Sequence, residues 1–158
     1  MVSVYIGLGS NLQGPEQQLR SALEELAAHP GIELAAVSSF YQSKPVGPQD
    51  QPDYVNAVAE LRTALPPEAL LDVLQATENQ HNRVRLRHWG ERTLDLDILL
   101  YGDQTLNTPR LIVPHKEMCN RSFVLYPLAE IAPQLTLPDG RRLPDVLRTV
   151  TNDLLPLR

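Results

Sequence analysis

Residues 92–101 read Arg-Thr-Leu-Asp-Leu-Asp-Ile-Leu-Leu-Tyr and place two acids inside an otherwise apolar β-strand. The apolar side chains at every second position from Leu94 to Leu100 are expected to fill one face of a sheet. Asp95 and Asp97 then share the opposite face, roughly 6.5 to 7 Å apart. Two such carboxylates repel each other and are costly to bury, whereas Mg²⁺ is often held by one or two carboxylates with substrate phosphates. The strand therefore predicts a magnesium site at Asp95 and Asp97, in preference to a solvated edge strand.

Four arginines precede or open this strand, in a run that reads Arg-Val-Arg-Leu-Arg-His-Trp-Gly-Glu-Arg over residues 83–92. A guanidinium can bind two phosphate oxygens at once, although most charge runs are solvated loops. The adjacent acids and the planar Trp89 favour a functional role for Arg83, Arg85 and Arg92. Carboxylates for a metal beside arginines for phosphate predict a metal–polyphosphate site.

The distribution of charge favours a small anionic ligand over nucleic acid. The net charge is −5, yet residues 1–82 hold three basic side chains against ten acidic ones, and residues 83–121 hold seven against five. An acidic chain with one local basic stretch is a poor general nucleic-acid binder.

Length and composition limit the classes of protein to which this chain can belong. With 158 residues, the chain is expected to form one domain over residues 1–158. Cys119 is the single cysteine, which excludes an internal disulfide and argues against a zinc site. The sequence shows neither a signal peptide nor an apolar run long enough to span a bilayer. We therefore expect a cytoplasmic protein with no membrane partner.

The order of elements predicts an α+β fold. It indicates a ferredoxin-like βαββαβ antiparallel sheet with helices packed on one face, followed by a short C-terminal extension. The first half is expected to contain a strand of alternating apolar residues 2–8 that ends in a glycine turn at 7–11, a helix from Pro15 to a stop at Pro30, and a strand over 33–41. After a stiff loop at 43–52, we expect a strand over 54–61, a helix that begins at Pro66, and the strand that carries the two aspartates.

Three further signals are weaker. Tyr54 and Asn56 share a strand face, which suggests a pocket for a flat polar ligand, although Tyr54 alone would be read as core. His115 is as consistent with a structural role as with a phosphate contact. The glycines of residues 7–11 lack the third glycine of the dinucleotide fingerprint and the lysine of a P-loop, so they carry little weight.

Taken together, these residues resemble the 6-hydroxymethyl-7,8-dihydropterin pyrophosphokinase family of folate biosynthesis. The resemblance covers nearly the whole chain and weakens toward the C-terminus. The matching stretches are residues 5–12 (YIGLGSNL), 38–41 (SSFY), 47–56 (GPQDQPDYVN), 89–99 (WGERTLDLDIL), Pro114-His115 and 120–123 (NRSF).

The resemblance implies transfer of pyrophosphate from ATP to the pterin hydroxymethyl group, with release of AMP, on a ferredoxin-like fold with two Mg²⁺ ions. It implies that Asp95 and Asp97 bridge those ions to the ATP phosphates, and that Tyr54 and Phe123 sandwich the pterin ring. The implied catalytic residues are Arg83, Arg85, Arg92 and Asp97. The implied pterin-binding residues are Ser43, Val46, Tyr54, Asn56, Asp95 and Phe123. The implied ATP-binding residues are Gln75, Glu78, Arg85, Trp89, Arg92, Leu99, Arg110, His115 and Arg121.

Two other functions remain open from the residues alone. One is a different metal enzyme, a nucleotidyl- or glycosyltransferase that uses the Asp pair on a similar sheet. The other is a non-catalytic RNA-binding module of related topology, which the acidic balance and the lack of interleaved strand aromatics disfavour. We expect a monomer whose partners are ATP and the pterin. Asp97 and a metal-bound water are both candidates for the general base, and the sequence does not choose between them.

Overall fold

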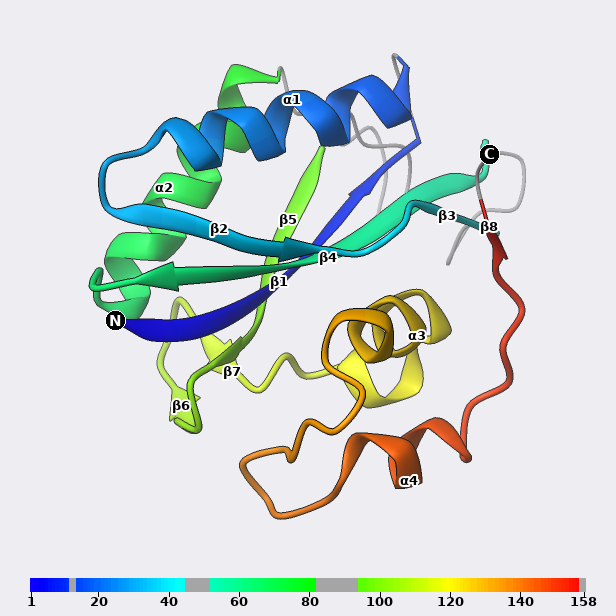
Figure 1. The fold of residues 1–158 in the computed structure, drawn as a ribbon. Helices are drawn as coiled ribbons and strands as arrows, with labels where there is room; N and C mark the ends of the chain where they lie inside the picture. The colour runs from blue at the N-terminus through cyan, green and yellow to red at the C-terminus, as the bar shows by residue number, and fades with distance from the viewer. Residues whose placement is uncertain (12–13, 45–51, 82–93, 157–158) are drawn as a thin grey trace.

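The computed structural model describes residues 1–11, 14–44, 52–81 and 94–156 and shows an α+β fold built on an antiparallel sheet (Figure 1). The six strands of the sheet pair antiparallel throughout. In spatial order they are β5 (Asp95–Tyr101), β1 (Val2–Ser10), β4 (Tyr54–Thr63), β3 (Tyr41–Ser43) and β8 (Leu155–Pro156), with β2 (Ile32–Val37) also paired to β4. The predicted α+β class with an antiparallel sheet is confirmed.

Two long helices, α1 (Pro15–Ala28) and α2 (Pro67–Gln80), cover one face of the sheet (Figure 1). Both begin at a proline, whose fixed φ suits the first turn of a helix, and both bury a stripe of leucines against the strands. The centre of this core contains Ile6, Leu19, Leu26, Leu61, Leu70, Leu74 and Leu96. Among the described residues, no helix is both long and apolar enough to cross a membrane.

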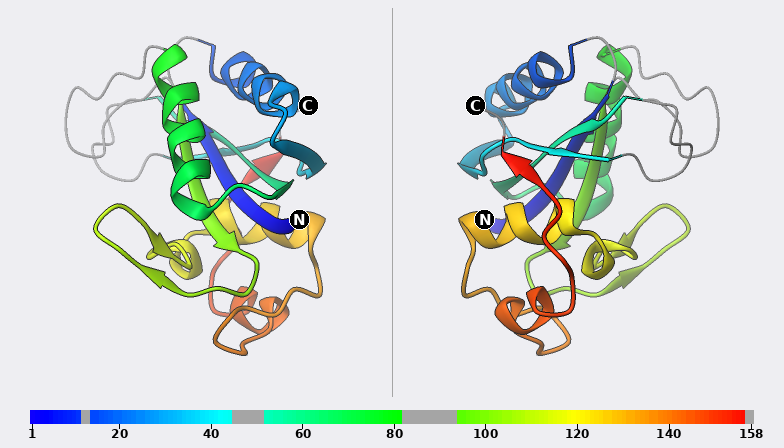
Figure 2. Two further views of the ribbon diagram at one scale, coloured as in Figure 1. Left: turned by 90° about the vertical axis from the view of Figure 1, so that its left-hand side faces the viewer. Right: turned by 90° about the vertical axis from the view of Figure 1, so that its right-hand side faces the viewer.

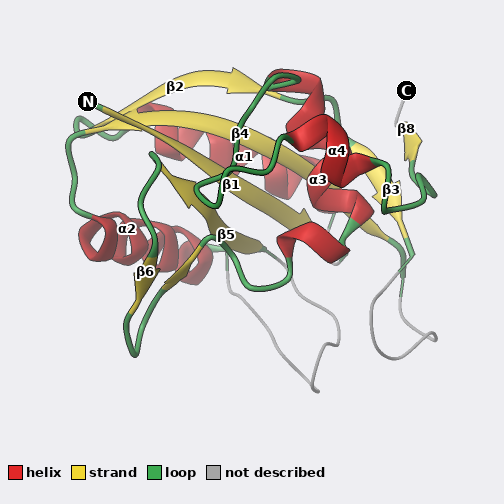
Figure 3. Ribbon diagram, turned by 90° about the horizontal axis from the view of Figure 1, so that it is seen from below, coloured by secondary structure: helices red, strands yellow, loops and turns green. Residues whose placement is uncertain are grey.

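The opposite face of the sheet is covered by the C-terminal residues. There α3 (Ser122–Ile131), preceded by the 3₁₀ helix η1 (Met118–Asn120), and α4 (Leu143–Leu147) pack around a second apolar core (Figure 3). That core includes Val58, Leu100, Met118, Val124, Leu125, Leu128 and Leu143. The two helices of the predicted βαββαβ plan do lie on one face, and the C-terminal extension, for which no face was predicted, carries enough apolar side chains to bury the other. A hairpin of β6 (Leu106–Asn107) and β7 (Ile112–Val113) extends beside α2 (Figure 2).

The strand expected over residues 33–41 is split into β2 and β3. Between β2 and β3 the regular strand pairing is interrupted, and Ser38 satisfies the backbone of Val58 instead. The Ser38 N–H donates to the Val58 carbonyl at 2.9 Å, and the Ser38 Oγ accepts from the Val58 N–H at 2.9 Å. A serine can satisfy a strand backbone through its side chain in this way.

A register shift between β1 and β5 changes the face on which Leu100 lies. Tyr5 pairs with Leu100, and the next residue, Ile6, pairs with Ile98, so Leu99 is an extra residue. The alternation predicted from Leu94 holds as far as Ile98, but Leu100 belongs to the core under α3. The prediction for Leu100 is wrong because an inserted residue reverses the facing of those that follow.

The glycines near the end of β1 do not form the predicted turn. Gly7 and Gly9 both lie inside the strand, which continues to Ser10. Of the described glycines, Gly14, Gly102 and Gly140 have positive φ. A strand glycine more often marks a place where another group approaches the sheet closely.

Candidate active site

A cleft of about 630 Å³ lies on the α3 side of the sheet, within the usual size range of ligand pockets. Its floor is a row of paired residues, in which Gly9 lies between Asn56 of β4 and Asp95 of β5. In the next row Gly7 lies between Val58 and Asp97. Because residues in register share a face, the two glycines leave the sheet bare between the acids and β4.

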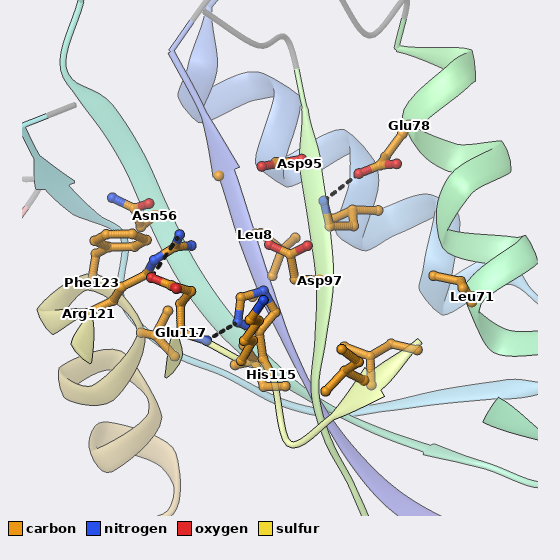
Figure 4. Close-up of a pocket in the computed structure, with 18 of the residues that line it drawn as sticks. Leu8, Asn56, Leu71, Glu78, Asp95, Asp97, His115, Glu117, Arg121 and Phe123 are labelled. Carbon is orange, nitrogen blue, oxygen red and sulfur yellow. Dashed lines mark hydrogen bonds and ion pairs between the residues drawn. The ribbon is translucent and has the colours of Figure 1, made fainter. Parts of the chain in front are cut away.

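The two acids of β5 point into this cleft, as their spacing predicts (Figure 4). Both are half-buried, and the bare glycines beside them leave room for a ligand above the sheet. Oxygen donors in pairs on one rigid strand suit a hard divalent cation. No cluster of three or more metal-ligating side chains occurs in the part of the chain that the structure describes.

Glu78 lies at the free edge of β5, between the two acids. Its carboxylate is buried, with 5% of the residue exposed, and accepts a hydrogen bond of 2.8 Å from the Leu96 N–H. This N–H points away from β1, so a side chain of α2 supplies the partner that a further strand would otherwise provide. Glu78 thus fixes the stretch of backbone that carries Asp95 and Asp97.

One end of the cleft is built from β3, β4 and the start of α3. The Asn56 Nδ2 donates to Ser43 Oγ at 2.6 Å, and both residues are buried. Phe123 faces Asn56 across this end (Figure 4), and Tyr54 lines the same wall. The Arg121 guanidinium lies 5.5 Å from the centroid of the Phe123 ring, a cation–π contact. The combination of a ring face and fixed amide groups suits a flat polar heterocycle.

His115 is held as a neutral imidazole over the middle of the cleft. Its backbone N–H donates to the carbonyl of the bulged Leu99 at 2.9 Å, and its Nδ1 accepts from the Glu117 N–H at 3.1 Å. An accepting Nδ1 carries no proton, which leaves Nε2–H as a donor. Burial, and then the charge of Arg121, lower the pKa of His115 below its ordinary value. Arg121 itself lies 3.9 Å from a Glu117 carboxylate oxygen.

The other end of the cleft lies between α2 and the β6–β7 hairpin. Arg110, at the tip of the hairpin, donates to Asp72 at 2.5 Å and to Gln75 at 3.3 Å. A second carboxylate, that of Glu68, is 3.8 Å away. The pKa of Arg110 is raised by its hydrogen bond to Asp72 and by the charges of both acids. Leu71 and Leu111 provide apolar walls at this end.

The structure brings most of the predicted site residues into one cleft. Those that line it are Ser43, Tyr54, Asn56, Gln75, Glu78, Asp95, Asp97, Leu99, Arg110, His115, Arg121 and Phe123. Val46, Arg83, Arg85, Trp89 and Arg92 lie outside the described residues, and so do most of the stiff loop and the arginine run. Their roles stay predictions.

Sequence reasoning missed several residues of this cleft. Gly7 and Gly9 were assigned to a turn, although their spacing of two inside an apolar alternation is a signal for a bare strand face. Lys44 and Lys116 bring further positive charge to the walls. Ile112, which is 45% exposed, lines the hairpin side, and its place there depends on a tertiary contact that no local pattern encodes.

Comparison with known proteins identifies the family to which this α+β chain belongs. Residues 5–133 match the family described as 7,8-dihydro-6-hydroxymethylpterin-pyrophosphokinase (HPPK). The chain belongs to this family, which makes it a pyrophosphokinase of folate biosynthesis.

Bacterial relatives match along nearly their whole length. A 2-amino-4-hydroxy-6-hydroxymethyldihydropteridine pyrophosphokinase of Haemophilus influenzae is 54% identical over 148 residues, which are 94% of this chain and 92% of that protein. A protein of the same name from Pseudomonas aeruginosa is 57% identical over 144 residues, which are 91% and 89% of the two chains.

Solved structures support the fold alone. Plasmodium falciparum HPPK-DHPS, wild type with pteroate, superposes with a TM-score of 0.74 at 12% identity over 94% of this chain. This chain spans 42% of that longer one.

Proposed function

We propose that this enzyme transfers the β,γ-pyrophosphate of ATP to the hydroxymethyl group of 6-hydroxymethyl-7,8-dihydropterin and releases AMP. The observation that carries the proposal is the order of groups along one cleft. The Asn56–Phe123 end, the Asp95–Asp97 pair and the α2–hairpin end follow one another (Figure 4). A flat heterocycle, a polyphosphate and a nucleoside fit that order.

The pterin is assigned to the end formed by Tyr54, Asn56 and Phe123. The 2.6 Å hydrogen bond to Ser43 orients the Asn56 amide, so that its oxygen can accept from a ring N–H. The aromatic rings can stack on the heterocycle. The backbone near Ser43 and Val46 is proposed to complete the recognition of its polar edge.

Asp95 and Asp97 are proposed to hold two Mg²⁺ ions, with ATP oxygens as the remaining ligands. When bound, a metal pair supplies positive charge that neutralises the transferred phosphates. The open sheet between the acids and β4 favours this assignment, since it leaves the pterin hydroxyl a path to the phosphates.

The nucleotide is assigned to the side of α2 and the hairpin. Gln75, Glu78, Leu99 and Arg110 all line the cleft and are proposed to contact the nucleotide, while His115 and Arg121 are proposed to contact the phosphates. The neutral His115 can donate through Nε2 to a phosphate oxygen. Arg83, Arg85, Trp89 and Arg92 are proposed to act on the phosphates and the nucleotide as well.

In the proposed reaction the pterin hydroxyl oxygen bonds to the β-phosphorus, and the bond from that phosphorus to the α–β bridging oxygen breaks. The bridging oxygen leaves with AMP, and the hydroxyl proton is lost, with Asp97 as one candidate acceptor. Rate acceleration would come mainly from positioning and charge neutralisation.

We further infer that the sheet is a ferredoxin-like one, with β2 and β3 together serving as its second strand. Residues 1–158 are proposed to form a single domain, because both cores pack on the same sheet. We also propose that the enzyme acts as a monomer. The cytoplasmic location stays a prediction.

The decisive experiment identifies the nucleotide formed from ATP, Mg²⁺ and the reduced pterin alcohol. The proposal requires AMP, whereas a nucleotidyl- or glycosyltransferase would release pyrophosphate or a nucleoside diphosphate. The Asp97→Asn variant should lose about 10³-fold in turnover. Asp103→Asn, an exposed acid just after β5, is the matched control and should retain full activity. Full turnover of Asp97→Asn with Mg²⁺ would overturn the metal assignment.

A further inference from the structure

A short brace joins α3 to β3 outside the cleft. The Glu130 carboxylate, near the end of α3, accepts hydrogen bonds from the Ser39 N–H at 2.8 Å, from Ser39 Oγ at 2.9 Å and from the Tyr41 hydroxyl at 2.5 Å. These residues lie at the break between β2 and β3, 89 or more positions away in sequence. Glu130 itself does not line the cleft.

The titration behaviour of the brace agrees with this geometry. Burial, then the hydrogen bond and charge of Glu130, raise the pKa of Tyr41 to about 12. Burial alone would raise the pKa of Glu130, yet the bonds from Tyr41 and Ser39 lower it. The carboxylate is therefore ionised and the phenol protonated at neutral pH, so the charge-assisted hydrogen bonds are intact.

The two elements that Glu130 joins differ in how firmly they are held. Leu125 and Leu128 anchor α3 in the second core, and both are fully buried. In contrast β3 has three residues and pairs with β4 and the two-residue β8. Glu130 therefore transmits the rigidity of the helix to the strand.

The end of β3 and the beginning of α3 both reach the same end of the cleft. Tyr41 pairs with Asn56, and Ser43 pairs with Tyr54, while Phe123 stands at the first turn of α3. A shift of β3 would move Ser43, and with it the acceptor that orients the Asn56 amide. The distance between the amide wall and the ring wall thus depends on the brace.

We propose that Glu130 is a positioning residue for the heterocyclic substrate: it sets the separation of the Asn56–Ser43 wall from the Phe123 wall through Ser39 and Tyr41. The inference rests on the proposed function for the identity of that substrate. Loss of Glu130 should therefore weaken binding of the pterin and leave binding of ATP unchanged, because the nucleotide end of the cleft is formed by α2 and the hairpin.

The test compares Glu130→Ala and Tyr41→Phe with the wild type. Glu24→Ala is the control, since it removes an exposed acid from α1, for which no partner is seen among the described residues. In Glu130→Ala, KM for the pterin should rise about 10-fold, as expected for the loss of charge-assisted hydrogen bonds, with KM for ATP unchanged. Tyr41→Phe should show a smaller rise, and the double variant should be less than additive. Glu130→Gln keeps an acceptor oxygen and should recover part of the loss.

Amide hydrogen exchange of residues 39–43 gives a readout that does not depend on activity. Exchange there should accelerate in Glu130→Ala and remain unchanged in Glu24→Ala. Unchanged exchange would overturn the brace. Faster exchange with an unaltered pterin KM would overturn the positioning role. If the wild type does not use the pterin at all, the proposed function fails, while the exchange result still decides whether Glu130 fixes β3.

Discussion

The Glu78 carboxylate closes the free edge of β5 by accepting the Leu96 N–H at 2.8 Å. The amide that it satisfies belongs to the residue between the two acids of the cleft. An ionisable side chain of α2 therefore sets the backbone from which the proposed metal ligands project, and it does so from a buried position.

Replacement of Glu78 by alanine should destabilise the protein by about 2 kcal/mol, because a buried N–H loses its acceptor. Glu78→Gln should retain more stability, since an amide oxygen can accept the same bond. Chemical denaturation measures both, and the Mg²⁺ concentration for half-maximal turnover should rise more in Glu78→Ala. Equal stability of the two variants would show that the bond to Leu96 is unimportant.

The bare strand face at Gly9 should be required for binding of the heterocycle. A Cβ at Gly9 would lie 3.4 Å from Asn56 Oδ1 and 3.9 Å from Tyr54 Cδ1, so Gly9→Ala should fold and yet narrow the cleft beside Asn56. We expect KM for the pterin to rise several-fold and the melting temperature to stay close to that of the wild type.

Gly7→Ala is the control for Gly9→Ala, because a Cβ at Gly7 would contact the Leu99 side chain at 3.5 Å rather than Asn56. Its effect on pterin KM should be smaller. A larger effect at Gly7 than at Gly9 would contradict the placement of the pterin.

The ion pair of Arg110 with Asp72 should compete with the nucleotide. Asp72→Asn removes the nearer of the two acids, so Arg110 becomes freer to meet an anionic ligand. Because exposed ion pairs contribute little, we expect KM for ATP to fall only about two- to three-fold. Glu16→Gln disrupts a similarly exposed pair with Arg20 and should leave KM unchanged. A rise in KM for ATP in Asp72→Asn would show that the pair instead holds Arg110 in its working position.

Stability should fall on mild acidification because of His115. The folded-state pKa of His115 is lowered by burial and by Arg121, so the unfolded chain binds more protons between that pKa and about 6.5. The contribution is present above about pH 6.5 and is lost as the pH falls through this window, by at most about 1.4 kcal/mol per pH unit.

His115→Asn removes the titration, and its side-chain oxygen can still accept from the Glu117 N–H. The variant should therefore show a flatter dependence of unfolding free energy on pH than the wild type between pH 7.5 and 5. Parallel curves would mean that His115 does not titrate differently in the folded and unfolded chain.

The sequence by itself determined that Asp95 and Asp97 share a face, because alternation along a strand is a local property of the backbone. It also predicted α1 and α2, since a proline start and a leucine stripe are local signals. The resemblance in the motifs indicated the remaining site residues, and all of those that the structure describes line one cleft.

Only the tertiary structure decided where Gly7 and Gly9 lie, that Leu99 is an extra residue in β5, and that β2 and β3 are separate strands. Each depends on a partner far away in sequence: β4 and β5 beside the glycines, Tyr5 and Ile6 opposite the bulge, and Glu130 beside the break. Alternation of side chains is set by neighbouring residues, whereas register and the pairing of polar groups are set by whatever the folded chain brings alongside.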